Sequence, residues 1–268
     1  MEDQVAKEEI QVAEAYEGLH VPALFRQFTV PMLDTISPKV GDRIVDVACG
    51  TGILARQATE TLGDSSLVAG VDPTPGMLAV ARRLAPSIDW RLGTAESIPY
   101  ADGTFDAVMS QFGMMFFTDR IQALREFLRV LKPGGRIAVA VWDKLENSEA
   151  YPIEVELLKR LAGERAADAL KTPFALGDRT QLIELFNVDG IEAVEINTHH
   201  GTAQFPSIKA MVEADLRGWL PIMGVLLPEE LIQEILSEAE IQLSRYVQPD
   251  GKVMFDAPAH IIACCKGQ

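Results

Sequence analysis

The chain has 268 residues, of which 48% are hydrophobic and 24% charged, a composition that suits one globular domain with a sizeable core. Its formal net charge is -15, so its surface repels nucleic-acid phosphates and anionic lipid headgroups, which proteins bind through Lys and Arg. No nucleic-acid partner is therefore expected. Membrane insertion is not expected either, because no segment approaches the roughly 20 uninterrupted apolar residues that span a bilayer.

Cysteine usage indicates a reducing compartment. The three cysteines, Cys49, Cys264 and Cys265, make neither a disulfide framework nor the spacing of zinc ligands. The first ten residues, MEDQVAKEEI, are acidic and lack the apolar run of a secretory signal. We therefore expect a cytoplasmic protein without a metal site.

Strand and helix patterns alternate through the first half of the chain. A helical segment is expected up to Leu33, broken at Pro22 and Pro31. After it, strands are expected at 43–48, 67–72, 90–92, 105–110 and 137–142, with helices at 53–61, 76–84 and 121–130 between them. This alternation favours a parallel sheet with helices on both faces, in which ligands bind beyond the carboxyl ends of the strands.

The second half has longer helical stretches and a less regular order. Helices are expected at 151–170, 178–186, from Ser207 toward Trp219, and at 229–245, with strands at 191–204 and 253–265. We predict a single domain over residues 1–268. It would comprise a helical cap at 1–39, a ligand-binding core at 40–143, and further strands with substrate-side helical insertions at 144–268.

The strongest local motif is VDVACGTG at 45–52. A β-branched strand runs into Gly50 and Gly52, which allow a sharp turn and close approach of a ligand, and a helix begins directly after them. Asp72 ends the next strand about 20 residues later, the spacing of a carboxylate that binds ribose hydroxyls. These features predict a nucleoside-binding βαβ unit.

The nucleoside has two candidate classes. Residues 50–55, GTGILA, also fit the dinucleotide pattern G-x-G-x-x-A, so an NAD(P)-dependent oxidoreductase is one alternative. Asp46 lies just before the turn, where a carboxylate would repel a pyrophosphate but attract a cationic amino group. This placement favours a cationic nucleoside such as S-adenosylmethionine (SAM).

Five segments in order resemble the class I SAM-dependent methyltransferases, and most closely their ubiquinone/menaquinone-biosynthesis branch of small-molecule enzymes. These segments are 45–52, 70–77, 93–100, 105–112 and 124–141, within a match over 40–143. The resemblance implies SAM as cofactor and a Rossmann-like α/β fold. The implied sheet has seven mostly parallel strands, of which the last, near 253–265, is antiparallel.

The resemblance also implies the cofactor-binding residues. These are Asp46, Ala48, Cys49, Gly50 and Gly52 at the turn, Asp72, Pro73 and Met77 at the ribose and adenine, Thr94, Ala95 and Glu96 at the adenine edge, and Ser110 and Gln111 beside the methionine. Two positions depart from the family pattern. Ala48 replaces a glycine, and Thr94 replaces the acid that accepts the adenine amino group, so Glu96 or the backbone of Ala95 would have to take its place.

Methyl transfer needs a general base only when the acceptor arrives protonated. His20, His199 and His200 are the candidates, and at most one of the last two faces a pocket, because neighbours on a strand point to opposite faces. The Met- and Phe-rich run at 112–117 and the apolar stretch at 221–228 suggest a wall and a lid for a small, largely apolar acceptor. Whether oxygen, nitrogen or carbon is methylated stays open, as does a non-catalytic protein that binds SAM or a partner.

Overall fold

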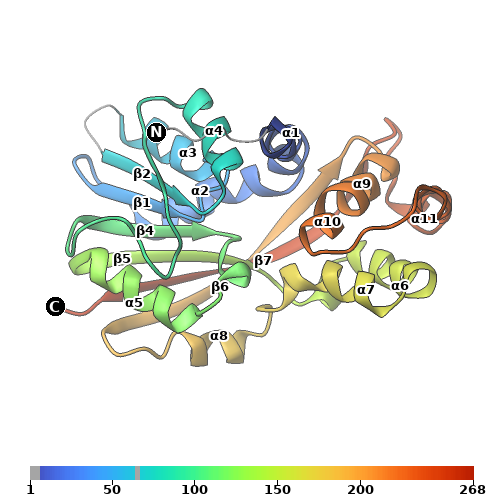
Figure 1. Ribbon diagram of the computed structural model, residues 1–268. Helices are drawn as coiled ribbons and strands as arrows, with labels where there is room; N and C mark the ends of the chain where they lie inside the picture. Colours follow the sequence, from blue (N-terminus) through green and yellow to red (C-terminus); the bar gives the residue numbers. More distant parts are fainter. Residues whose placement is uncertain (1–6, 64–66) are drawn as a thin grey trace.

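The computed structural model describes residues 7–63 and 67–268, which share one seven-stranded sheet in the order β3-β2-β1-β4-β5-β7-β6 (Figure 1). The strands are β1 Arg43–Val47, β2 Leu67–Asp72, β3 Asp89–Leu92, β4 Phe105–Gln111, β5 Leu131–Trp142, β6 Ile191–Phe205 and β7 Val253–Lys266. The pairs among β1 to β5 are parallel, and β7 is antiparallel to both β5 and β6. The predicted fold class is confirmed.

The central strands are apolar on both faces because helices cover both faces. Ile44, Val45 and Val47 of β1 are fully buried, as expected for a strand inside a parallel sheet. The helices of the first half are α3 Ile53–Leu62, α4 Pro75–Leu84 and α5 Arg120–Val130. Asp119 is the N-cap of α5, and its carboxylate accepts a hydrogen bond from the backbone N–H of Gln122.

The second half adds helices at the end of the sheet toward which β4 points (Figure 1). These insertion helices are α6 Tyr151–Ala162, α7 Glu164–Lys171, α9 Ile208–Ala214, the π-helix η6 Asp215–Trp219, α10 Leu220–Ile222 and α11 Glu229–Gln242. Helix α8, Arg179–Leu185, lies apart from them along the sheet. The helix expected over 151–170 is two helices, because Gly163 takes a positive φ of 88° between them.

The N-terminal segment is the main departure from expectation. Residues 7–36, here called the cap segment, are helical throughout as α1 Lys7–Ala15, η1 Tyr16–Phe25, η2 Arg26–Phe28 and α2 Thr29–Ile36. The expected break at Pro22 is a π-helix instead, and Pro31 lies in the first turn of α2, where no intrahelical N–H bond is lost. Residues 1–6 belong to the N-terminal stretch that was expected not to be a secretory signal, and they lie outside the described residues.

The cap segment is held on both sides of the sheet. At one side, α1 packs so closely on α4 that a Cβ at Gly76 would lie 2.6 Å from the carbonyl oxygen of Glu9. At the other, the side-chain oxygen of Gln27 accepts a hydrogen bond from the backbone N–H of Thr202 in β6 at 2.7 Å. Arg136 of β5 donates to the carbonyl of Ile36 at 2.8 Å. The cap segment therefore spans the sheet from α4 to β6, and its last helix, α2, ends near the first residues of β4.

Candidate cofactor site

The turn after β1 has an unusual backbone. Ala48, Gly50 and Gly52 all have positive φ, of 58°, 56° and 85°, and α3 begins immediately afterwards. Ala48 is the strained residue of the three, because a left-handed conformation costs a residue with a Cβ about 1–2 kcal/mol of conformational free energy. The alanine that departs from the family pattern is thus tolerated under strain.

Glycine is needed at positions 50 and 52 of the turn for different reasons. A Cβ at Gly52 would lie 2.2 Å from a ring carbon of Trp90, whose indole N–H donates to the carbonyl of Ala85. A Cβ at Gly50 would meet only the ring of Tyr16, at an ordinary 3.7 Å. Packing against Trp90 therefore requires glycine at 52, whereas at 50 glycine is favoured by its positive φ.

Asp72, at the end of β2, connects the two halves of the predicted nucleoside unit. Its carboxylate accepts hydrogen bonds from the backbone N–H of Gly50 and of Thr74, both at 2.8 Å. The residue is 6% exposed, and burial raises the pKa of its carboxyl while the two N–H donors oppose the rise. An acceptor that can take further hydrogen bonds is thereby fixed beside the turn.

Asp46 lies beneath the same turn. It is buried, it accepts a hydrogen bond from the backbone N–H of Ala55 at 3.2 Å, and burial raises its pKa to about 8, with the charge of Asp72 adding to the rise. Two buried carboxyls so close together favour a cation and disfavour a pyrophosphate. Cys49, between them in sequence, is buried with its thiol pKa raised, so it is a packing residue rather than a nucleophile.

The cap segment covers this turn. Glu17 accepts a hydrogen bond from the hydroxyl of Thr51 at 2.5 Å and forms an ion pair with Arg56 at 2.7 Å. Tyr16 lies over Gly50, and burial, followed by the charge of Asp72, raises the pKa of its phenol. Sequence reasoning missed Glu17 and Thr51, because residues 34 positions apart in the chain carry no local signal of their contact.

At the expected adenine edge, Thr94 is exposed and Ala95 buried. One carboxylate oxygen of Glu96 accepts hydrogen bonds from the backbone N–H groups of Thr118 and Asp119, at 2.7 and 3.2 Å, ahead of α5. One of the two carboxylate oxygens of Glu96 is therefore already used in hydrogen bonds within the protein. Its predicted role at the adenine, with those of Pro73 and Met77 beside it, stays a prediction.

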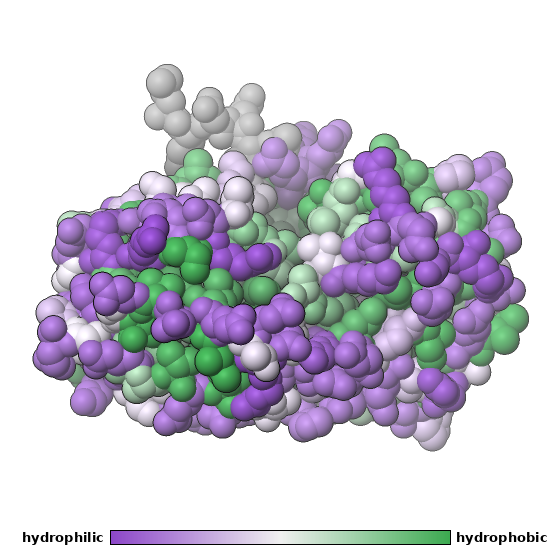
Figure 2. Space-filling view, turned by 90° about the horizontal axis from the view of Figure 1, so that it is seen from below, coloured by the Kyte–Doolittle hydropathy of each residue, from purple (hydrophilic) through white to green (hydrophobic). Residues whose placement is uncertain are grey.

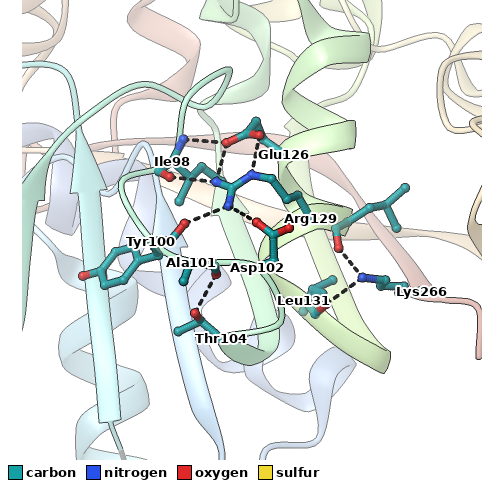
Figure 3. Close-up of polar contacts among 10 residues, drawn as sticks. Ile98, Tyr100, Ala101, Asp102, Thr104, Glu126, Arg129, Leu131 and Lys266 are labelled. Atoms are coloured by element: carbon teal, nitrogen blue, oxygen red, sulfur yellow. Dashed lines mark hydrogen bonds and ion pairs between the residues drawn. The ribbon is translucent and has the colours of Figure 1, made fainter.

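An arginine fixes the segment that follows the adenine edge (Figure 3). Arg129 of α5 donates to the carbonyls of Ile98 and Tyr100 at 2.9 and 2.8 Å, and to the carboxylate of Asp102 at 2.7 Å. Glu126 pairs with Arg129 at 2.7 Å and accepts from the backbone N–H of Ile98 at 2.9 Å. The ion pair with Arg129 lowers the pKa of Glu126, so the loop is held by charge-assisted bonds.

The end of β4 carries buried polar atoms that lack partners. Within the described residues, Ser110 Oγ and Gln111 Oε1 have no hydrogen-bond partner, although Gln111 Nε2 donates to the carbonyl of Phe25 at 3.2 Å. Phe112 follows with a positive φ of 55°, unusual for a bulky side chain, and stacks on Trp142 at 4.1 Å between ring centroids. Buried orphan atoms and a strained residue at one strand end are typical of a binding site.

The structure separates the candidate histidines. His20 lies in the cap segment and stacks on Tyr16 at 5.7 Å. His199 lines a surface depression with Pro31, and the side chain of His200, 72% exposed, pairs with Asp256 at 2.8 Å. Both are on the edge strand β6 and are not brought to the turn, so only His20 of the three lies beside the cofactor-site residues described above.

Across 7–63 and 67–268, no group of three His, Cys, Asp or Glu side chains could hold a metal ion. No helix in that part of the chain is long and apolar enough to cross a membrane.

Comparisons with known proteins agree with this geometry. Residues 45–139 match the methyltransferase domain family. A demethylmenaquinone methyltransferase of Renibacterium salmoninarum is 41% identical over 41% of this chain and 45% of its own length. The ubiquinone/menaquinone biosynthesis C-methyltransferase UbiE of Hahella chejuensis is 34% identical over 57% of this chain and 66% of its own length. This chain thus spans less than two thirds of either relative.

A solved structure shows the same fold. Phosphoethanolamine N-methyltransferase 2 of Haemonchus contortus, in complex with S-adenosyl-L-methionine, superimposes with a TM-score of 0.60 at 20% identity, covering 96% of this chain and 57% of that one. That likeness is one of fold, and residues 45–139 carry the methyltransferase domain. Both sequence relatives are methyltransferases by name. The predicted likeness to methyltransferases is confirmed, and the NAD(P) alternative has no support.

Proposed function

We propose that this protein transfers a methyl group from SAM to a small, largely apolar acceptor. The observation that carries the proposal is the pair of buried acids, Asp46 and Asp72, around the turn at Gly50. SAM is a nucleoside with a sulfonium and an ammonium group. Its ribose hydroxyls can donate hydrogen bonds to Asp72, and its positive charges are attracted by the two buried acids.

The residues present fit the cofactor. Asp72 would accept the ribose hydroxyls, the turn at 48–52 would lie against the methionine end, and Ser110 Oγ and Gln111 Oε1 would gain the partners that they lack among the described residues. Bound SAM supplies an activated methyl group on sulfur. The chain itself has to bind, orient and exclude water, which is the larger part of catalysis in such an in-line displacement.

Aromatic side chains between the cap segment and the sheet suit a flat acceptor. Phe25 and Phe112 lie 5.4 Å apart, and Trp142 lies 4.1 Å from Phe112 and 6.1 Å from Phe25. The names of the sequence relatives point to a quinone precursor, and we propose a hydroquinone-type ring as the acceptor.

The Met- and Phe-rich run has two parts. Met114 and Met115 are buried and pack in the core. Phe116 is 50% exposed and contacts Trp219 of the insertion helices at 5.4 Å. Ile222 and Leu226 beyond it are exposed, and Figure 2 shows apolar surface around a recess between the two halves of the molecule. We propose that this side admits the acceptor.

Titration calorimetry with SAM and with its demethylated product tests cofactor binding. A second assay follows label from methyl-labelled SAM into quinols, phenols, sterol-like compounds and amines. Binding of NAD(P)H but not SAM would reject the proposal. SAM binding without transfer to any small molecule would instead favour the non-catalytic alternative.

A further inference from the structure

Several polar atoms are buried without partners where the cap segment meets the end of β4. Among the described residues, His20 Nδ1, Ser110 Oγ and Gln111 Oε1 are each sealed from solvent and have no hydrogen-bond partner. Leaving a buried polar group unpaired costs about 1–3 kcal/mol. Such groups call for a ligand that supplies the missing bonds.

Ring contacts connect His20, through Tyr16, to the proposed acceptor region. Tyr16 stacks on His20 at 5.7 Å and on Phe25 at 5.4 Å, and Phe25 in turn contacts Phe112 at 5.4 Å. Gln111 donates to the carbonyl of the same Phe25. His20 and Gln111 are therefore connected through neighbouring aromatic residues. His20 contacts the ring of Tyr16, which also lies over Gly50 and stacks on Phe25, and Gln111 binds the backbone of Phe25.

We propose that His20 is the general base of methyl transfer, its Nδ1 accepting the hydroxyl proton of a phenol-type acceptor. This inference rests on the proposed function. As the proton moves to Nδ1, the electrons of the breaking O–H bond enter the ring or its oxygen. A new bond forms from that carbon or oxygen to the methyl carbon while the sulfur–methyl bond breaks. For attack by ring carbon, the methylated cyclohexadienone becomes aromatic again when its ring proton leaves to water and its carbonyl oxygen takes the proton back from the imidazolium of His20.

The charge balance favours this assignment. Before transfer the single positive charge is on the cofactor's sulfur, and after transfer it is on the imidazolium of His20. The site therefore holds one positive charge throughout, and forming a buried imidazolium adds no net charge. Burial alone lowers the pKa of His20, to about 4, so the ring is unprotonated at neutral pH before SAM and acceptor bind.

The other histidine in the core cannot take this role. His260 is 2% exposed and both its ring nitrogens are engaged, Nδ1 with Thr198 at 2.9 Å and Nε2 with Asp143 at 2.9 Å. His200 lies on the edge strand β6 and pairs with Asp256 of β7. It offers a matched control, because its substitution leaves the site intact.

The test uses 1,4-naphthohydroquinone, kept reduced, as the acceptor probe with the full chain and its His20→Gln and His200→Gln variants. We expect His20→Gln to bind SAM within twofold of the wild type and to lose about 100-fold or more in kcat. His200→Gln should match the wild type. Between pH 6 and 9 the wild-type rate should vary little. The His20→Gln rate should rise about tenfold per pH unit as the probe ionises itself, toward the pKa of phenols near 10.

Three results would overturn the inference. A His20→Gln rate within threefold of the wild type would remove His20 from the reaction and leave the proposed function intact. Equal losses in SAM affinity and rate, with an unchanged pH profile, would make His20 structural. A wild type that binds SAM but never methylates the probe would reject the hydroquinone-type acceptor and the base together.

Discussion

The carboxylate of Asp72 accepts a hydrogen bond from the backbone N–H of Gly50 at 2.8 Å. One side chain at the end of β2 thus holds the turn that follows β1, and the same carboxylate faces the proposed ribose. Asp72→Ala should weaken SAM binding by roughly 2–4 kcal/mol, the value of two charge-assisted hydrogen bonds. Calorimetry on the folded variant measures this. Substituting the exposed Asp189 should change nothing, and an unchanged affinity in Asp72→Ala would place the ribose elsewhere.

SAM binding should release a proton. With a pKa raised to about 8, Asp46 is mostly protonated at pH 7, and a cationic ligand favours its ionised form. The affinity for SAM should therefore rise by up to about tenfold per pH unit below pH 8 and level off above it. Calorimetry in buffers of different ionisation enthalpy counts the protons. Asp46→Asn should lose most of this dependence; an equal dependence in the variant would assign it to another group.

Ala48→Gly should stabilise the protein. Ala48 has a φ of 58°, and glycine removes a penalty of about 1–2 kcal/mol at the expense of some unfolded-state entropy, leaving a gain of about 0.5–1 kcal/mol. Urea unfolding measures it. Ala79→Gly within α4 is the opposite control and should lower the free energy of unfolding by about 1 kcal/mol. A loss in Ala48→Gly would show that the turn is unstrained.

Acid should destabilise the native state through His20. Its folded pKa, about 4, lies below the unfolded value near 6.5, so between these pH values the unfolded chain binds a proton that the native state does not. This contribution is complete above pH 6.5 and is lost as the pH falls toward 4, at up to about 1.4 kcal/mol per pH unit. Unfolding curves at pH 7, 6 and 5 should be less pH-dependent in His20→Gln. NMR titration of the four histidines gives the pKa directly, and a value near 6.5 for His20 would refute the burial.

Local patterns were enough to predict most of the framework. The strands and the turn at 45–52 lie close to their expected positions, because buried parallel strands are continuous apolar runs and the turn needs glycine. The break expected at Pro22 was wrong, because the helix widens to a π-helix there and continues to Phe25. What the sequence could not predict were contacts between residues far apart along the chain.

The contacts that shape the site join residues far apart in sequence. Gln111 meets Phe25 across 86 positions, and Glu17 meets Thr51 across 34. No periodicity or spacing encodes such pairs, which arise only when the cap segment folds over the sheet. Sequence could therefore name Gln111 and His20 separately but could not show that Tyr16 and Phe25 connect them.

The indole of Trp90 restricts the order in which this motif can change. A Cβ at Gly52 or at Gly70 would lie 2.2 Å from its ring, so neither glycine can be replaced while the indole stays. A smaller residue at 90 would first have to free the space, at the cost of a cavity of about 3–5 kcal/mol. Along an evolutionary path, substitution at 90 must precede substitution at 52, and the intermediate is the least stable of the series. The glycine in this turn is thus preserved by a neighbour that does not need to touch the proposed cofactor.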